Sequence, residues 1–151
     1  MSAEDLEELE DMGPVDWVIL EWTGDRPSGG EVAPMIIDLV DRGIIRVLDI
    51  GFVAKGEDGA ITVLDLDHLG SDSPFAAFAG ASSGLLDHAD LEDAADAMTP
   101  GASAAVLMWE NRWAAPLAIA LRRSGGQLVA SGRVQVQALL AQLDALEASA
   151  R

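Results

Sequence analysis

The feature of this sequence that most constrains its fold is a strand–helix–strand unit that occurs twice. Each copy begins with an apolar strand-like run, continues with apolar residues at helical spacing, and returns after glycine in a second apolar run. In the first copy the three elements are residues 15–22, 32–42 and 44–53, and in the second they are residues 104–109, 114–124 and 127–131.

The two copies align without a gap from the helix into the second strand. Pro34 falls on Pro116, and Gly43 falls on Gly125. Proline in the first turn and glycine just past the last turn are residues that helix termini favour. We therefore expect one sheet built from two related halves.

Two such units in tandem make the βαββαβ plait of ferredoxin-like domains, an antiparallel sheet with two helices on one face. We predict this α+β fold with an extra third strand (60–66) and a helix (87–98) inserted between the halves, followed by a C-terminal helix (134–148). The predicted strand order is fifth, first, fourth, second, third, which makes the first strand an inner strand.

Two local signals support the inserted elements. Asp58-Gly59 lies between two β-branched runs and predicts a tight hairpin. Asp87 and Asp90 have the spacing of a capping box and predict the start of a helix.

The C-terminal helix carries an apolar stripe that needs a partner. The stripe consists of Val136, Leu139, Leu140, Leu143 and Leu146. These side chains either complete the core on the open face of the sheet or form a dimer contact, and we favour the core.

The chain is strongly acidic, with 26 Asp and Glu residues against 9 Lys and Arg residues and a net charge of −17. Such a surface repels phosphate backbones and anionic lipid, so we expect neither nucleic-acid nor membrane binding. The sequence has no cysteine, which excludes disulfides and thiolate chemistry.

The N-terminal residues 1–12 are rich in acids and predict a flexible tail, or a short helix when docked. A single domain is expected over residues 13–151. The acidic start lacks the basic and apolar segments of a signal peptide, and the longest apolar run, residues 113–121, is too short to span a bilayer. We expect a cytoplasmic protein.

One motif matches the G-x-S-x-G pattern of a nucleophile elbow, at residues 80–84. That site requires a strand before the serine, a helix after it and a later histidine as base. Here residues 75–79 are not strand-like, and His88 is the only later histidine. We interpret the match as chance.

Two further loops offer polar groups without a complete ligand set. Asp65, Asp67 and His68 could hold a divalent ion weakly, but other positions of a calcium loop are apolar, and solvated acids are the better interpretation. Residues 24–31 form a glycine-rich loop before a helix N-terminus, where free N–H groups could bind an anion. The loop lacks the Lys and the Ser or Thr of a phosphate loop. We therefore assign no catalytic, cofactor-binding or metal-ligating residue.

Tryptophans gather at the corresponding strand-to-helix corners of the two copies. Trp22 closes the first strand, and Trp109 and Trp113 flank the turn after the fourth. An antiparallel arrangement of these strands puts the corners at opposite ends of the sheet, so a shared pocket is not expected. The three side chains are interpreted as core or, where partly exposed, as interface residues, and Asn111 is interpreted as an N-cap.

Several segments together resemble a family of small uncharacterised bacterial proteins with a domain of unknown function, most familiar from high-GC bacteria. The segments are residues 13–16 (GPVD), 31–34 (EVAP), 43–49 (GIIRVLD), 100–105 (PGASAA) and 109–111 (WEN). The resemblance covers residues 13–148 and implies a ferredoxin-like fold. It implies no activity, so it assigns no role to any residue.

Two hypotheses follow for function. The first is a non-enzymatic domain that self-associates as a homo-oligomer and acts as an interaction or regulatory module, with a further protein partner as an option. The second is a small-molecule-binding domain or enzyme with a site between the sheet and the helices. We favour the first, because the sequence lacks a catalytic constellation and has more tryptophan than a small core needs.

Overall fold

The computed structural model describes residues 11–150. They divide into two compact units, the first ending at Ala120 and the second beginning at Leu121. The predicted N-terminal tail lies outside the described residues, apart from Asp11 and Met12.

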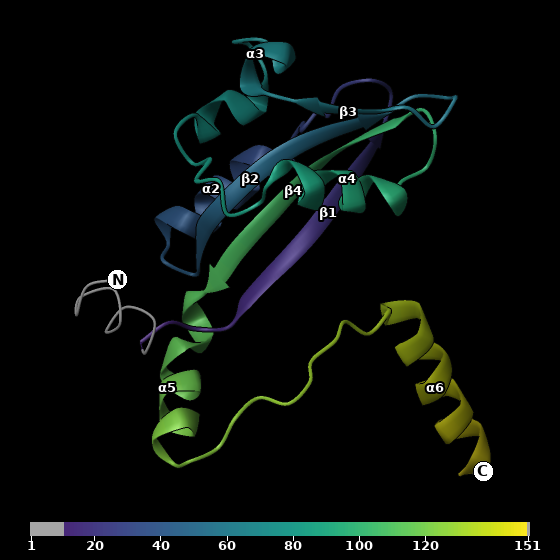
Figure 1. Ribbon diagram of the computed structural model, residues 1–151. Helices are drawn as coiled ribbons and strands as arrows, with labels where there is room; N and C mark the ends of the chain where they lie inside the picture. Colours follow the sequence, from purple (N-terminus) through teal and green to yellow (C-terminus); the bar gives the residue numbers. More distant parts are fainter. Residues whose placement is uncertain (1–10, 151) are drawn as a thin grey trace. The chain divides into compact units, whose positions relative to one another are not determined.

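The first unit is built on a four-stranded antiparallel sheet with the order β1-β4-β2-β3 (Figure 1). The strands are β1 (Val15–Thr23), β2 (Ile45–Lys55), β3 (Ile61–Leu64) and β4 (Ala102–Asn111). The mixed α+β class is confirmed, and these four strands are neighbours as the sequence predicted. The hairpin between β2 and β3 is also confirmed, with Lys55 paired to Ile61.

The predicted fifth strand is wrong, because residues 127–131 form no strand. Only Leu128, Val129 and Ala130 are apolar in that segment, and Gly126 and Gly132 flank it. So little apolar surface does not offset the cost of ordering a glycine-flanked strand. Within the described residues β1 is therefore an edge strand rather than an inner one.

One face of the sheet is covered by α2 (Val32–Asp41), the short helix α3 (Leu66–Leu69) and the 3₁₀ helix η1 (Pro74–Phe78). Phe75 is fully buried at the centre of this layer. Its ring meets those of Phe52 and Trp22 edge-on, with centroids 5.3 and 5.7 Å apart. Ile36 of α2 and Leu107 of β4 belong to the same core.

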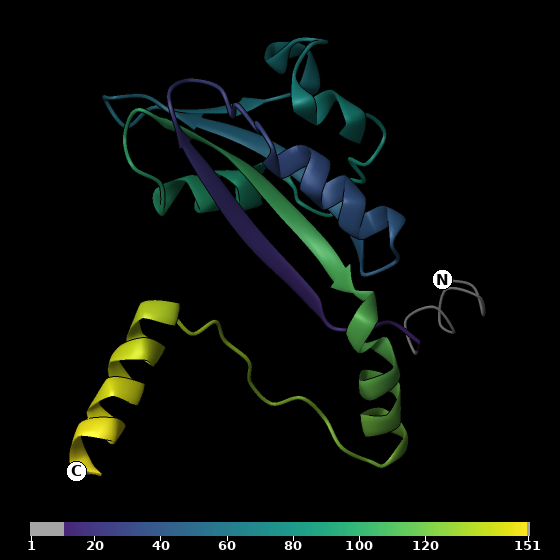
Figure 2. The same ribbon diagram turned by 180° about the vertical axis from the view of Figure 1, so that it is seen from behind.

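The opposite face is covered by α4 (His88–Asp96), as the two views in Figures 1 and 2 show. Leu91, Ala95 and Met98 pack there against Val53 and Val106. The predicted capping box is confirmed, since the Asp87 and Asp90 carboxylates each accept from the other residue's backbone N–H.

The placement of helices differs from the expected plait, in which both repeat helices share one face. The inserted helix α4 takes the second face instead, and the repeat helix α5 (Ala115–Arg123) has no buried side chain. A short 3₁₀ helix, η2 (Arg112–Ala114), comes between β4 and α5. Leu91 and Ala95 of α4, with Met98 just after it, fill the second face of the sheet, whereas Leu117 of α5 is 70% exposed and does not take the place that the plait assigns to this helix.

The second unit contains α6 (Val136–Ser149), which confirms the predicted C-terminal helix to within two residues at its start. Within the second unit its apolar stripe is not covered, and its members are between 48% and 68% exposed. Its opposite side is lined by alanines at positions 138, 141, 145 and 148. Within this unit no other segment packs on the leucine-rich side, and its role in the core of the sheet or in a dimer contact stays a prediction.

Candidate functional site

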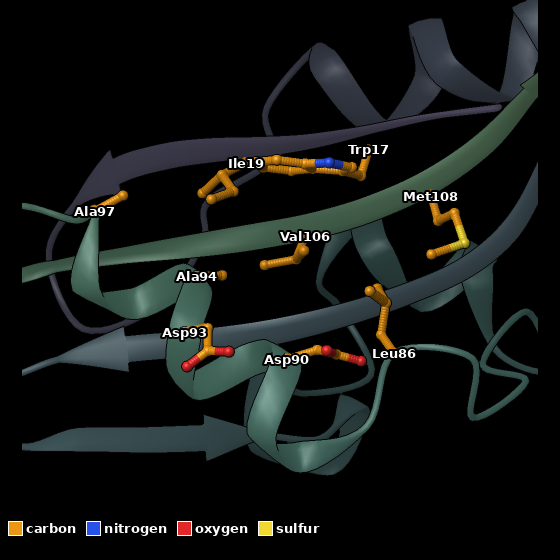
Figure 3. Close-up of a pocket in the computed structure, with 9 residues that line it drawn as sticks. All are labelled: Trp17, Ile19, Leu86, Asp90, Asp93, Ala94, Ala97, Val106 and Met108. Carbon is orange, nitrogen blue, oxygen red and sulfur yellow. The ribbon is translucent and has the colours of Figure 1, made fainter.

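An apolar recess of about 340 Å³ lies on the α4 face of the sheet, beside that helix (Figure 3). Its floor is formed by β1 and β4. Its wall is formed by α4 together with Leu86, which precedes the helix N-cap. The residues that line it are Trp17, Ile19, Leu86, Asp90, Asp93, Ala94, Ala97, Val106 and Met108. All of them except the two aspartates are apolar.

The floor of the recess follows from strand register. Trp17 lies opposite Met108, and Ile19 lies opposite Val106. Directly opposed residues of an antiparallel pair project from the same face, so all four side chains meet on the α4 side. The helix packs chiefly against β2 and β3, buries Val106 of β4 and leaves β1 open on this face. Trp17 is consequently 66% exposed.

A buried carboxylate anchors the loop that leads into α4. Asp49 of β2 accepts from the backbone N–H of Ser83 at 2.9 Å, of Leu86 at 2.6 Å and of Ile50 at 2.9 Å. A buried charge is tolerated when hydrogen bonds replace its lost hydration, and three donors do so here. The loop is thereby fixed with Leu86 at one end of the recess.

The other end of α4 is held by two further side chains. The ammonium of Lys55 donates to the carbonyls of Ala95 at 3.1 Å and Met98 at 3.2 Å, where a cation complements the helix dipole. The carboxylate of Glu21 on β1 accepts from the backbone N–H of Thr99 at 2.7 Å. The recess is therefore framed by a helix tied to the sheet at both ends.

A positively charged corner lies on the same face beyond Trp17. Glu110 is buried at the end of β4 and accepts from the backbone N–H of Gly13 at 2.8 Å. Arg46 Nε lies 2.9 Å from Glu110 Oε1, an ion pair in which the N–H is not aligned as a hydrogen bond, and Arg112 Nη1 lies 3.6 Å from the same oxygen. Two guanidinium groups share one carboxylate, so these three side chains together carry excess positive charge.

The three tryptophans named from the sequence lie in different surroundings. Trp22 meets Phe75 in the core, and Trp109 packs against the core on the α2 face. Trp113 is 68% exposed, and its indole N–H donates to the Asn111 side chain at 3.3 Å. The structure does not bring the three together, since the β1–β4 register puts Trp22 and Trp109 at opposite ends. Their role as interface residues stays a prediction.

Asn111 does not cap the following helix through its side chain, which corrects the expectation. Its amide donates instead to the carbonyl of Pro14 at 3.1 Å and to Asp16 Oδ2 at 2.9 Å. The antiparallel register brings the start of β1 beside the end of β4, and the amide bridges the two.

Sequence reasoning missed Trp17, the aromatic side chain of the recess. Apolar residues on both sides of β1 predicted a central strand with both faces covered, so no exposed aromatic side chain was expected there. The available signal was strand parity, which puts Trp17 and Ile19 on the face away from Trp22. Parity alone does not show which face stays open, because that depends on where α4 packs.

The other sequence motifs have structural explanations. In the G-x-S-x-G loop, the Ser83 hydroxyl donates to the carbonyl of Leu48 at 2.8 Å. His88 pairs with Glu92 on its own helix at 3.4 Å. Gly29, in the glycine loop before α2, lies so close to the Phe75 ring that a Cβ would come within 2.7 Å of it.

The acidic segment after β3 also serves the local fold. The Asp65 carboxylate accepts from the His68 backbone N–H at 3.0 Å and starts α3. Among residues 11–150, no three His, Cys, Asp or Glu side chains are grouped so as to hold a metal ion.

Comparison with known proteins places the chain in a family. A family model described as a family of unknown function (DUF6325) matches residues 11–150. The chain belongs to this family. Neither the curated proteins nor the solved structures include one that matches this DUF6325 chain. Within residues 11–150, no helix is both long enough and apolar enough to cross a bilayer.

Proposed function

We propose that this DUF6325 chain is a non-enzymatic, self-associating interaction domain. The observation that carries the proposal is the apolar recess beside α4, in which Trp17 of β1 is 66% exposed, on a frame fixed by Asp49, Lys55 and Glu21. A rigid apolar strip loses little conformational entropy on binding, which is what a docking surface needs.

The exposed part of Trp17 is worth a useful amount of binding energy. Burial of a tryptophan removes some 150–250 Å² from water, so covering the exposed two thirds of this side chain contributes about 2–4 kcal/mol. Exposed side chains of this kind at the centre of a patch are the usual anchors of protein interfaces.

Self-association is favoured over a foreign partner because the chain carries two apolar surfaces, the recess strip and the α6 stripe. Two copies can cover all of them. Each copy also carries a net charge of −17, so the copies repel one another at low ionic strength. We therefore expect association to strengthen when salt is added, because salt screens this repulsion while leaving the apolar contacts intact.

The finer structural and cellular assignments are part of the same proposal. The β1-β4-β2-β3 order supports a ferredoxin-like relationship, with the fifth strand absent from this sheet. The acidic composition supports a cytoplasmic location, and the resemblance to a family of bacterial proteins supports a bacterial cell.

A second candidate is the binding of an apolar small molecule in the recess. Its volume of about 340 Å³ is at the lower end of ligand sites. The lining has few polar groups to orient a ligand, and of its two carboxylates Asp90 is already engaged in the helix cap. This candidate predicts saturable binding of an apolar dye by a monomer.

Sedimentation velocity over a range of protein concentrations tests the proposal. We expect a concentration-dependent shift from monomer to a discrete dimer or larger species, at lower concentration in high salt than in low salt. A monomer at every concentration and salt would overturn self-association. If that monomer also binds an apolar dye in a saturable manner, the second candidate replaces the first.

A further inference from the structure

The recess and the leucine stripe of α6 match each other in kind, length and charge. We infer that α6 of one copy docks antiparallel to α4 in the recess of a second copy, and that the second copy returns the contact. This inference rests on the proposed self-association and names the two surfaces that produce it.

The lengths of the two surfaces agree. The 14 residues of α6 extend about 21 Å at 1.5 Å per residue. The open strip of β1 runs from Val15 to Glu21, about 20 Å at 3.3 Å per residue. A helix that lies along this strip sits beside α4 and completes a two-helix layer on the sheet face.

Charge decides the direction of the helix. Asp144 and Glu147 are the acids of α6, and both lie in its C-terminal half. Arg46 and Arg112 form the positive corner at the Val15 end of the strip. A carboxylate near the C-terminus of a helix is also repelled by the negative end of the helix dipole. A nearby pair of arginines offsets that repulsion and attracts the carboxylates directly.

The other end of the helix agrees with the same direction. Arg133, three residues before the first residue of α6, is the one charged residue between positions 124 and 143. At the far end of the strip it would lie near Glu21 and Asp93, which carry negative charge there. The reversed direction would put Asp144 and Glu147 beside these carboxylates and Arg133 beside Arg46.

The area supports a reciprocal exchange. A 14-residue helix lying on a sheet covers a footprint of about 21 by 10 Å and removes on the order of 400 Å² from each partner, so a single contact falls below the roughly 1,000 Å² of specific interfaces. Two reciprocal contacts remove roughly 1,600 Å², the usual size of a stable interface. The exchange is closed and two-fold, which stops growth at a dimer.

Charged substitutions on the two surfaces test the pairing. Trp17→Lys alters the recess, and Leu143→Glu alters the stripe; both side chains are exposed in one copy, so the fold is expected to survive. Each variant should weaken dimerisation roughly 30-fold or more, the effect of losing a central anchor side chain. Matched controls are Met35→Lys, an exposed site on α2, and Ala141→Glu, on the alanine side of α6; neither should weaken the dimer.

Mixing the two variants separates this pairing from other dimers. The Trp17→Lys chain keeps an intact α6 and the Leu143→Glu chain keeps an intact recess, so their mixture should form a heterodimer that neither forms alone, measured by energy transfer between labelled chains. In this heterodimer one contact joins the two unsubstituted surfaces. In the other contact, the Lys introduced at position 17 of one chain faces the Glu introduced at position 143 of the other. Far-UV circular dichroism of each variant verifies that it is folded.

The possible results have distinct meanings. A wild-type dimer that Leu143→Glu disrupts and Trp17→Lys does not would show α6 pairing with α6, overturning the inference while self-association stands. A wild-type dimer that neither variant affects would overturn it too. A wild-type monomer would remove the proposed function and the inference together.

Discussion

The ammonium of Lys55 on β2 donates to the carbonyl of Ala95 near the end of α4, across 3.1 Å and 40 positions of sequence. The same nitrogen reaches Met98, so the single lysine of this chain closes the helix against the sheet. Position 55 therefore controls the wall of the recess although it does not line it.

Replacing Lys55 by Met removes both hydrogen bonds and keeps much of the side chain's length. We expect the free energy of unfolding to fall by about 1.5–3 kcal/mol, the usual range for hydrogen bonds to a charged group, measured by urea denaturation. Arg42→Met is the matched control, because Arg42 pairs only with Asp38 at the exposed surface and should cost at most about 0.5 kcal/mol. Equal losses in the two variants would mean that Lys55 does not hold α4.

Substitution of Asp49 should lower the free energy of unfolding more than substitution of any exposed acid of the chain. In Asp49→Asn, one oxygen that accepts a backbone hydrogen bond becomes a donor, which leaves buried N–H groups facing an N–H group. We expect a loss of about 1–3 kcal/mol. Hydrogen exchange should show faster exchange at the amides of Ser83 and Leu86 than at the centre of β2.

Asp58→Asn is the control for that substitution, because its carboxylate accepts from the backbone N–H of Ala60 in an exposed turn. Asn also suits such a turn, so its effect should stay within about 0.5 kcal/mol. Unchanged exchange at Ser83 and Leu86 in Asp49→Asn would show that the loop is held by other contacts.

Much of the first unit could be predicted, because its signals are local or periodic. The Asp58-Gly59 turn, the Asp87–Asp90 cap and the alternation of β1 each specify an element without distant information. The repeat also gave the correct neighbours for the first four strands. The prediction of a fifth strand was wrong because it was based on alignment of residues 127–131 with the strand at 44–53. The later segment lacks most of the apolar residues that stabilise the earlier strand.

The recess could not be predicted, because it depends on which helix takes the second face of the sheet. The helix α4 takes that face by packing Leu91, Ala95 and Met98 against the sheet, and the repeat specifies no face for this inserted helix. Once the outcome is known, the exposure of Trp17 follows from register alone. The anchoring role of Asp49 was equally hidden, since its partners in the loop, Ser83 and Leu86, lie more than 30 positions away.

Trp113→Ala tests the interface role that the sequence assigned to the tryptophan corners. The indole is mostly exposed and makes one side-chain hydrogen bond, to Asn111, so truncation should lower stability by no more than about 1–1.5 kcal/mol. The interface role predicts weaker self-association of the folded variant, measured by sedimentation velocity, whereas the pairing of α6 with the recess alone predicts no change. An unchanged, well-folded assembly would take Trp113 out of the interface.

Gly51 determines how closely α4 approaches the sheet. It lies on β2 beneath the helix, where an added Cβ would come within 2.6 Å of a methyl carbon of Leu91. Gly51→Val therefore overpacks this contact, and we expect a loss of about 1–3 kcal/mol, because a close-packed layer must shift to admit the larger side chain. The shift moves α4 away from β2, so the recess beside it should change shape, and the emission spectrum of Trp17 should change with it.

Two variants decide whether that effect comes from the contact with Leu91. Gly132→Ala adds a methyl group where nothing lies within 4 Å and should leave stability nearly unchanged. Combining Gly51→Ala with Leu91→Ala frees space for the added Cβ, so the double variant should lose less stability than the sum of the two single losses. Strict additivity would show that the Gly51 position acts through the strand backbone, and that Leu91 does not set the height of α4.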